Sequence, residues 1–387
     1  MSKIVKIELT PVFVPFRQQI LELMKAGEGG LGMAIAAEEE WNGGDFVICK
    51  MFDDAGNHGL GEAFVWLPET GVSPDQLIDL IRQSLSQYVL GESPFDVEKI
   101  RQRMNINVNR CEVAKGLIDI ACYDLMGKIT NRPAHDFMGG KCKDELPLCA
   151  LIPLMPVEHM IGLCQKFYAE GMRTFRLKLG LGIEKDKAII GKFREVMGDQ
   201  VRLRVDYNQA YSPTMAVRAL LAIEPFGIDF AEQPVKADNY AGMAYVQARV
   251  NVPVMAHEGC FSLQDINTLI NMKGINTIGM NAERPGGVTN MLHVISYAQM
   301  EGIGCVLHNQ PLGIGSAMQI HVAAARYHDL GHDIELFGEI MLEDDLITTP
   351  IKYENGTVTV PTAPGWGVEL DEVALKKYAT SDTVIIE

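Results

Sequence analysis

Four short apolar segments that end in charged residues recur at nearly constant intervals in the middle of this 387-residue chain. The charged residues are Lys178, Asp206, Glu232 and Glu258, separated by 28, 26 and 26 positions. Each segment runs into polar residues and then glycine, proline or a helix-like pattern, as a strand does where it ends at a loop. In an eightfold β/α barrel all strand ends of this kind meet at one face, so the spacing predicts that these four side chains lie close together.

The same alternation of strand and helix continues on both sides of these segments. Candidate helices occupy residues 158–169, 184–197 and 214–223. Eight repeats predict a modified (β/α)8 barrel of the TIM type over residues 131–344, and an open doubly wound sheet fits less well because no GxGxxG follows the first strand. The candidate strands end near Ile152, Leu179, Asp206, Glu232, His257, Asn281, His308 and Phe337.

The first 130 residues follow a different pattern, with strands first and helices after. Strands are expected at 4–14 and 46–52, and a polar stretch at 17–44 reads as a long loop of the functional or mobile kind. We therefore expect an α+β capping domain at 1–130, to which the tail at about 345–387 returns. The expected helices of this domain are 74–90, 97–108 and 111–130.

Composition limits the partners and the compartment. A net charge of -16 argues against nucleic acid and against an anionic membrane surface, and no apolar run is long enough to span a bilayer. The eight cysteines never form a CxxC pair and mostly fall in apolar segments. They are expected to be reduced, which is typical of a cytoplasmic protein.

Three carboxylates at one place repel one another unless a cation neutralises them. Asp206, Glu232 and Glu258 offer oxygen ligands, which favour a hard ion, Mg²⁺ above all, with Mn²⁺ able to substitute. The alternative is that they are ordinary surface acids in an acidic chain. Their shared position at strand ends favours a metal site.

Several motifs resemble the enolase superfamily, in its muconate-lactonising and mandelate-racemase branches, over essentially the whole chain. They are the segments 58–63, 121–128, 335–338 and 364–370, together with Phe-Arg-Leu-Lys at 175–178 and the three spaced carboxylates. The resemblance implies that Lys178 is a base and that the carboxylates bind the metal. Enolase-superfamily sites are themselves known for a Lys or His base that works with Mg²⁺ to remove a proton beside a carboxylate.

The chain departs from that family at four positions. Arg176 replaces the first family lysine and stays charged, and it disfavours the ammonium form of Lys178 beside it. Asn281 stands where one branch has a second lysine and the other an aspartate. His308 lies about where the racemase branch has its base. The third metal ligand is ambiguous between His257 and Glu258, and we choose Glu258 because oxygen suits the hard ion better.

We therefore expect Lys178, His308 and Arg176 to be catalytic. Asn208 and Glu339, each two residues beyond a strand end, are expected with Asn281 to bind substrate. For Lys178 and His308 the alternatives are a surface lysine and a hydrogen-bonded core histidine.

The expected enzyme is a homo-oligomer that acts on a small carboxylate. An isomerase (cycloisomerase, racemase or epimerase) is preferred, because the tail resembles the lactonising branch. The alternatives are a hydroxy-acid or sugar-acid dehydratase and a catalytically silent binding protein. A silent protein fits less well because Lys178 and all three carboxylates are intact.

Overall fold

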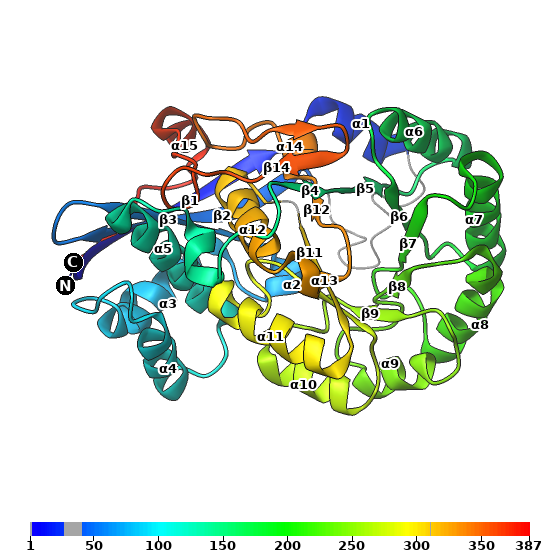
Figure 1. Cartoon of the computed structure of the whole chain (residues 1–387), viewed down its shortest axis with the longest axis horizontal. Coiled ribbons are helices and arrows are strands. Elements are labelled where there is room, and N and C mark those ends of the chain that lie inside the picture. The colour runs from blue at the N-terminus through cyan, green and yellow to red at the C-terminus, as the bar shows by residue number, and fades with distance from the viewer. Residues whose placement is uncertain (1, 27–40, 310) are drawn as a thin grey trace.

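The computed structural model describes residues 2–26, 41–309 and 311–387. A ring of strands surrounded by helices fills one side of the molecule, and an antiparallel sheet with its own helices packs beside it (Figure 1). Both chain ends lie at the far edge of that sheet. The predicted α/β class with a capping unit is therefore confirmed.

The barrel sheet contains eight parallel strands whose spatial order follows the sequence from β5 to β12. The first and last strands close the ring through a bridge between Leu148 and Ile334, and the Cys149 amide donates to the Ile334 carbonyl at 2.9 Å. Every strand ends within one residue of its predicted end. The strands are β5 (Cys149–Ile152), β6 (Thr174–Lys178), β7 (Arg202–Asp206), β8 (Phe230–Glu232), β9 (Val254–Ala256), β10 (Thr277–Met280), β11 (Gly304–Asn309) and β12 (Glu335–Leu336).

Helices connect successive barrel strands and cover the outside of the ring. Most are amphipathic, but every residue of α12 is buried. This helix contains no charged residue and contacts both the barrel and the cap strand β3. The helices are α6 (Val157–Ala169), α7 (Ile183–Met197), α8 (Pro213–Ile223), α9 (Tyr240–Gln247), α10 (Leu263–Asn271), α11 (Gly287–Glu301), α12 (Gly313–Ala325), α13 (Tyr327–Leu330) and α14 (Gly338–Met341).

The capping sheet has the order β15-β1-β2-β3, so its outer strand comes from the end of the chain. A small second sheet, β13-β14-β4, joins the tail to the chain just before the barrel. The strands are β1 (Ile4–Pro15), β2 (Gly43–Asp53), β3 (His58–Phe64), β4 (Glu145–Pro147), β13 (Tyr353–Glu354), β14 (Thr357–Thr359) and β15 (Val384–Ile386).

The cap helices differ from the prediction at two places. A helix, α1, begins inside the stretch predicted as a loop, and the rest of that loop, at 27–40, lies outside the described residues. The helix predicted at 74–90 changes after α3 into one π-helical and one 3₁₀ segment. The cap helices are α1 (Gln18–Ala26), α2 (Leu67–Thr70), α3 (Pro74–Leu80), α4 (Val97–Asn107), α5 (Glu112–Thr130) and α15 (Glu372–Tyr378).

Strand β3 packs so closely on α5 that only glycine fits at two of its positions. A Cβ at Gly59 would lie 2.3 Å from the Ala121 carbonyl oxygen, and one at Gly61 would lie 2.7 Å from that of Leu117. The same glycines weaken the strand pattern in the sequence. Helix α5 is thereby held directly against the capping sheet.

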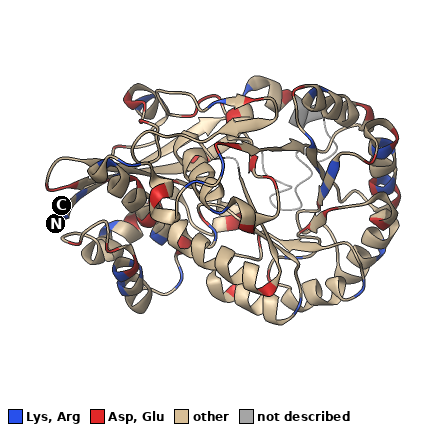
Figure 2. Ribbon diagram, viewed as in Figure 1, with Lys and Arg blue, Asp and Glu red and all other residues tan. Residues whose placement is uncertain are grey.

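Charged residues of both signs are spread over the outer helices (Figure 2). Basic residues also occur within barrel strands β6 and β7, where side chains alternate between the interior and the helices. Among the described residues, no helix combines the length and the apolar character needed to cross a lipid bilayer.

Candidate active site

Strand β6 supplies two cations to the barrel interior. Arg176 and Lys178 are two residues apart, so their side chains leave the strand on the same side, and both are buried. Neutral residues occupy the alternate positions and face the helices. Burying two cations in a barrel requires partners of opposite charge, and these come from the neighbouring strands.

Lys178 is held by residues at the end of β7. Its Nζ donates a hydrogen bond to Oδ2 of Asp206 at 2.5 Å and another to Oδ1 of Asn208. The side-chain Nδ2 of Asn208 in turn donates a hydrogen bond to Oε1 of Glu258 at 3.3 Å. The predicted base, one predicted substrate-binding residue and two predicted metal ligands therefore lie in one hydrogen-bonded group.

Arg176 links the carboxylates of three strands. Its Nη1 donates to Oδ2 of Asp206 at 2.9 Å and to Oε2 of Glu232 at 2.7 Å, and its Nε lies 2.8 Å from Oε2 of Glu335. Burial alone would lower the pKa of Arg176, but Glu232, Glu335 and Asp206 raise it well above its usual value. Arg176 is thus a fixed charge, and Glu335 is an inward-facing acid that the sequence analysis did not single out.

Two of the predicted metal ligands are acids in an unfavourable environment. Burial raises the pKa of Glu232 well above its usual value, although Arg176 opposes the change. Burial, together with the charges of Glu69 and Asp206, raises the pKa of Glu258 to about 7. A cation beside both groups would restore their ionised forms.

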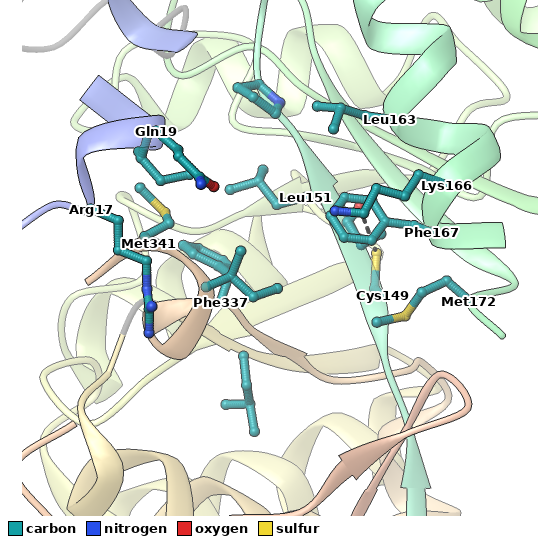
Figure 3. A pocket seen from close by; sticks show the side chains of 15 residues that line it. Arg17, Gln19, Cys149, Leu151, Leu163, Lys166, Phe167, Met172, Phe337 and Met341 are labelled. Atoms are coloured by element: carbon teal, nitrogen blue, oxygen red, sulfur yellow. Dashed lines mark hydrogen bonds between the residues drawn. The ribbon is translucent and has the colours of Figure 1, made fainter. Parts of the chain in front are cut away.

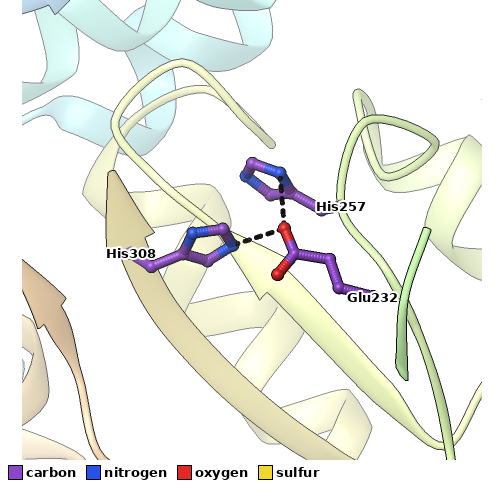
Figure 4. A group of neighbouring side chains, drawn as sticks. All are labelled: Glu232, His257 and His308. Carbon is purple, nitrogen blue, oxygen red and sulfur yellow. Dashed lines mark ion pairs between the residues drawn. The ribbon is translucent and has the colours of Figure 1, made fainter. Parts of the chain in front are cut away.

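Two histidines face the same glutamate from β11 and from the loop after β9 (Figure 4). Oε1 of Glu232 lies 3.3 Å from Nδ1 of His257 and 3.7 Å from Nε2 of His308. The two imidazole rings pack together with centroids 3.9 Å apart. A Cβ at Gly279 would come within 3.0 Å of both rings, so a glycine on β10 makes room for the pair.

Both imidazoles are neutral in this environment. Burial lowers the pKa of His257 well below its usual value, and the nearby Arg284 lowers it further. Burial and then Arg176 do the same for His308. A neutral imidazole has one nitrogen free to accept a proton, which a general base requires.

The arrangement fits a bound cation. Oε1 of Glu232, Oε2 of Glu258 and Nε2 of His308 are buried without a hydrogen-bond partner among the described residues. One ligand atom each from Glu232, His257 and His308 lie within 4.8 Å of one another. Unpartnered buried acceptors are the atoms that a bound cation satisfies.

The chain turns sharply directly after the carboxylates of β7 and β8. Asn208, Gln209 and Gln233 have positive φ angles of 39°, 66° and 33°, which are uncommon for residues other than glycine. Oε1 of Gln233 accepts hydrogen bonds from the amides of His257 and Gly259, at 3.0 and 3.1 Å. Strained backbone of this kind is concentrated at functional sites, and it fixes the positions of adjacent strand ends here.

The loop after β10 brings in Arg284, a residue that the sequence analysis missed. Its Nη2 lies 2.7 Å from Nε2 of His257, and its Nη1 lies 2.9 Å from Oε2 of Glu69 on the cap helix α2. Asn281 supports this loop, because its Oδ1 accepts hydrogen bonds from the amides of Glu283 and Arg284. Nothing in the sequence spacing marks Arg284, since it lies four residues beyond the end of β10.

Glu339, expected to bind substrate, makes no hydrogen bond or ion pair with these groups among the described residues. It lies half-buried on α14, where its backbone carbonyl accepts a hydrogen bond from Arg17, and burial raises the pKa of its carboxyl. The other eight predicted site residues are buried at the barrel strand ends or in the loops that follow them.

An apolar cavity of about 180 Å³ lies where α1, α6 and α14 meet β5 and β12 (Figure 3). Phe337 lines it and also stands against the guanidinium of Arg176, 5.7 Å from the ring centroid. Leu151, which also lines the cavity, pairs with Arg176 in the β5–β6 register. Arg17 and Lys166 are the charged residues of the lining, which contains no acid.

Two sequence profiles match the chain. The profile "Enolase C-terminal domain-like" matches residues 159–374, and the profile "Mandelate racemase / muconate lactonizing enzyme, N-terminal domain" matches residues 32–139. The N-succinyl-L-Arg/Lys racemase of Bacillus cereus is 27% identical over 88% of this chain and 91% of its own. The hydrophobic dipeptide epimerase of Enterococcus faecalis is 31% identical over 75% of this chain and 82% of its own.

Solved structures agree with these relatives. The N-succinyl Arg/Lys racemase superposes with a TM-score of 0.89 over 100% of both chains, at 26% identity. A dipeptide epimerase of Enterococcus faecalis, complexed with Mg and L-Leu-L-Tyr, gives a TM-score of 0.84 over 95% of this chain and 99% of its own, at 27% identity. A muconate lactonizing enzyme of Pseudomonas fluorescens gives 0.87 over 98% and 99%, at 26% identity.

Proposed function

Since this chain belongs to the mandelate racemase and muconate lactonizing enzyme family and is an isomerase of that type, we propose that it moves the proton beside the carboxylate of a small organic acid. The single observation that carries this proposal is the buried cluster of Lys178, its acidic partners and a neutral histidine at one end of the barrel. Racemisation or epimerisation is the preferred form of the reaction.

The proposed metal is Mg²⁺, with Mn²⁺ as a substitute, held by Asp206, Glu232 and Glu258. Their donor atoms are all oxygens, which suits a hard ion. When bound, the ion supplies Lewis-acid stabilisation of the negative charge that forms on the substrate carboxylate. Arg176 fixes the side chains of Asp206 and Glu232 through its two hydrogen bonds.

Lys178 is the proposed base on one face of the substrate. Its contacts with Asp206 and Asn208 fix the position of Nζ, so the amine can be aimed at one hydrogen of the substrate. The substrate carboxylate is proposed to accept a hydrogen bond from Asn208. Asn281 and Glu339 remain predicted substrate contacts. Asn281 also has a structural contact, because its Oδ1 accepts a hydrogen bond from the backbone amide of Arg284.

His308 is the proposed partner on the opposite face. It lies on β11, three strands from β6 around the closed ring, and its Nε2 is free of hydrogen bonds among the described residues. Racemisation needs a proton donor and an acceptor on opposite faces, because a lone lysine would return the proton to the side from which it came. In one direction the neutral imidazole of His308 accepts the proton while Lys178, as an ammonium, donates one on the other face, and in the reverse direction the protonated His308 donates while the neutral amine of Lys178 accepts.

The apolar cavity supports a substrate that carries an apolar group. Phe337 lines the cavity and its ring centroid lies 5.7 Å from the guanidinium of Arg176, so a molecule whose carboxylate faces the cluster is proposed to place its side group towards the cavity. Leu163→Trp, which fills the cavity from α6, is expected to raise KM most for substrates with bulky side groups. Gln165→Trp on the exposed side of the same helix is the control.

Solvent-deuterium exchange tests the two faces separately. Lys178→Ala is expected to abolish exchange of the α-proton in one enantiomer, and His308→Asn should block turnover of the other while Lys178 still exchanges its own. Full activity of the His308 variant in both directions would refute the two-base isomerase. Loss of water from the substrate, seen by product analysis, would instead identify a dehydratase.

Two further properties are proposed for the enzyme. We expect a homo-oligomer, which light scattering on the purified protein measures, and a cytoplasmic location, which cell fractionation measures.

A further inference from the structure

The loop after β10 places an arginine against the histidine that competes with Glu258 for the metal. Arg284 is 1% exposed, and its Nη2 lies 2.7 Å from Nε2 of His257. A guanidinium has donors only, so this contact requires Nε2 of His257 to accept a hydrogen bond. The single proton of the neutral imidazole is thereby confined to Nδ1.

Nδ1 of His257 faces the carboxylates, 3.3 Å from Oε1 of Glu232 and 3.7 Å from Oε2 of Glu258. A ring nitrogen that carries its proton has no lone pair to give to a metal. Histidines that bind metals normally donate their other N–H to a carboxylate, a carbonyl or water. The other nitrogen of His257 meets a buried cation instead.

We infer that Arg284 is a positioning residue that confines the imidazole proton of His257 to Nδ1, the nitrogen that faces Glu232, and so keeps this imidazole off the metal. The inference rests on the proposed metal site of Asp206, Glu232 and Glu258. It gives a reason why the adjacent His257 would not shift the metal preference of that site from Mg²⁺ towards zinc. Glu232, His257 and His308 together would form a set of two nitrogens and one carboxylate, which is typical of zinc or non-haem iron. When Nδ1 of His257 carries the proton, this ring cannot bind the metal. The carboxylate oxygens are then the main ligands, and the site favours Mg²⁺ or Mn²⁺.

A residue of the cap contributes to this proposed selection of the metal ion. Nη1 of Arg284 lies 2.9 Å from Oε2 of Glu69 on α2, so a cap residue holds the arginine from the side opposite His257. On the barrel side, Oδ1 of Asn281 accepts from the Arg284 amide at 3.0 Å, and the Asn281 amide donates to the Arg284 carbonyl at 2.9 Å. The contacts run without a gap from Glu69 through Arg284 and His257 to the proposed ligand Glu232.

Metal titrations of the full-length, metal-stripped protein test the inference. Wild type, Arg284→Met and Arg284→Lys are titrated by calorimetry with Mg²⁺ and with Zn²⁺, and the visible spectrum is recorded with Co²⁺. In Arg284→Met the ratio of Zn²⁺ to Mg²⁺ affinity is expected to rise roughly 10- to 100-fold, with a Co²⁺ spectrum that reports an added nitrogen ligand. Arg284→Lys should keep the wild-type ratio, because an ammonium also donates to Nε2.

A second substitution assigns the change to His257. Adding His257→Asn to Arg284→Met is expected to return the affinity ratio to the wild-type value, whereas zinc bound elsewhere in the chain would survive it. Nitrogen NMR of ¹⁵N-histidine-labelled wild type with Mg²⁺ should show His257 protonated at Nδ1. A purely structural role for Arg284 would weaken both metals equally and leave their ratio unchanged.

The inference and the proposed function fail in different ways. An unchanged ratio in Arg284→Met, or a wild-type His257 whose Nδ1 binds the metal, would overturn the role of Arg284 while Mg²⁺ binding stays intact. A wild-type protein that binds no Mg²⁺, or binds it equally well after Asp206→Ala, would overturn the metal site itself.

Discussion

Buried acids in two regions of this molecule are satisfied in different ways. At the junction where cap elements β3 and α5 meet the barrel and the C-terminal tail, carboxylates accept hydrogen bonds from backbone amides. Glu62 accepts from Leu312 and Gly315 at 2.7 and 2.8 Å, and Asp124 accepts from Leu60 and Trp366 at 2.7 and 2.6 Å. At the barrel mouth, Glu232 and Glu258 accept hydrogen bonds from side chains, Arg176 for Glu232 and the amides of Asn208 and Gln209 for Glu258, and each retains one oxygen without a partner.

The kind of hydrogen-bond partner distinguishes carboxylates with a structural role from carboxylates that are available to a ligand. A backbone amide cannot leave, so a carboxylate that it holds ties two segments together and has nothing to offer a ligand. The arginine partner of Glu232 and the side-chain amide partners of Glu258 leave one oxygen of each acid, Oε1 of Glu232 and Oε2 of Glu258, unpartnered. Burial alone therefore does not identify a functional acid in this chain, whereas the kind of partner does.

The largest expected effect comes from neutralising an acid at the mouth. Glu232→Gln should weaken Mg²⁺ binding by at least about 100-fold, because removing a ligand costs more than the loss of an outer contact. Calorimetric titration measures the affinity. Asp124→Asn at the junction is the matched control, and an equal loss of affinity in that variant would erase the distinction between the two regions.

Asp124→Asn is expected to lower stability instead. An amide oxygen can serve only one of the Leu60 and Trp366 amides, and the other then faces the NH₂ group, which costs about 1–3 kcal/mol. Urea unfolding gives the change in free energy. A variant as stable as the wild type would show that these hydrogen bonds do not hold the C-terminal tail and β3 to α5.

The pH dependence of stability sharpens the comparison through Glu62. Burial raises the pKa of Glu62 from 4.5 to about 8, although two backbone amides oppose the shift. The folded state therefore holds this proton more tightly than the unfolded state, and the associated stability is full below pH 4.5 and is lost as the pH rises towards 8. Between those limits the loss for one group is about 1.4 kcal/mol per pH unit.

Glu62→Gln cannot titrate, so its unfolding free energy should fall less steeply over that window than that of the wild type. Urea unfolding at pH 5.5 and at pH 7.5, compared between the two proteins, measures the difference. Parallel slopes would mean that Glu62 does not carry the raised pKa.

The smallest effect is expected at Glu339, which belongs to neither group. Glu339→Gln should change stability by less than about 0.5 kcal/mol, because the residue is half-buried and only its backbone carbonyl is bonded to Arg17. A several-fold rise in KM of this variant, measured once the substrate has been identified, would show that Glu339 binds substrate.

The strand-end residues of the site were predictable because a parallel barrel converts sequence spacing into a shared position. Lys178, Asp206 and Glu232 each end a strand, so a period of one strand and one helix was enough to group them. Strand β3 was harder to recognise, since two glycines that allow close contact with α5 also break its pattern.

Arg284 and Glu69 could not be found in this way. Arg284 reaches His257 from a loop, and Glu69 comes from another domain, so neither has a fixed spacing from its partner. The choice between His257 and Glu258 likewise depends on where a proton lies on an imidazole. A sequence holds no direct record of that position, and only the contact with a donor such as a guanidinium implies it.

The pairing of β1 with β15 has a consequence for synthesis. Ile7 pairs with Ile386, so the edge of β1 that faces β15 has no strand partner until residues 384–386 have been synthesised, long after β2 has become available for the other edge. Closing a loop of about 380 residues costs about 5 kcal/mol of chain entropy, against about 3 kcal/mol for adjacent barrel strands. An unpaired strand edge is a template for pairing with other chains. The three residues of β15 therefore cover an edge of β1 that would favour aggregation, and they also complete the sheet.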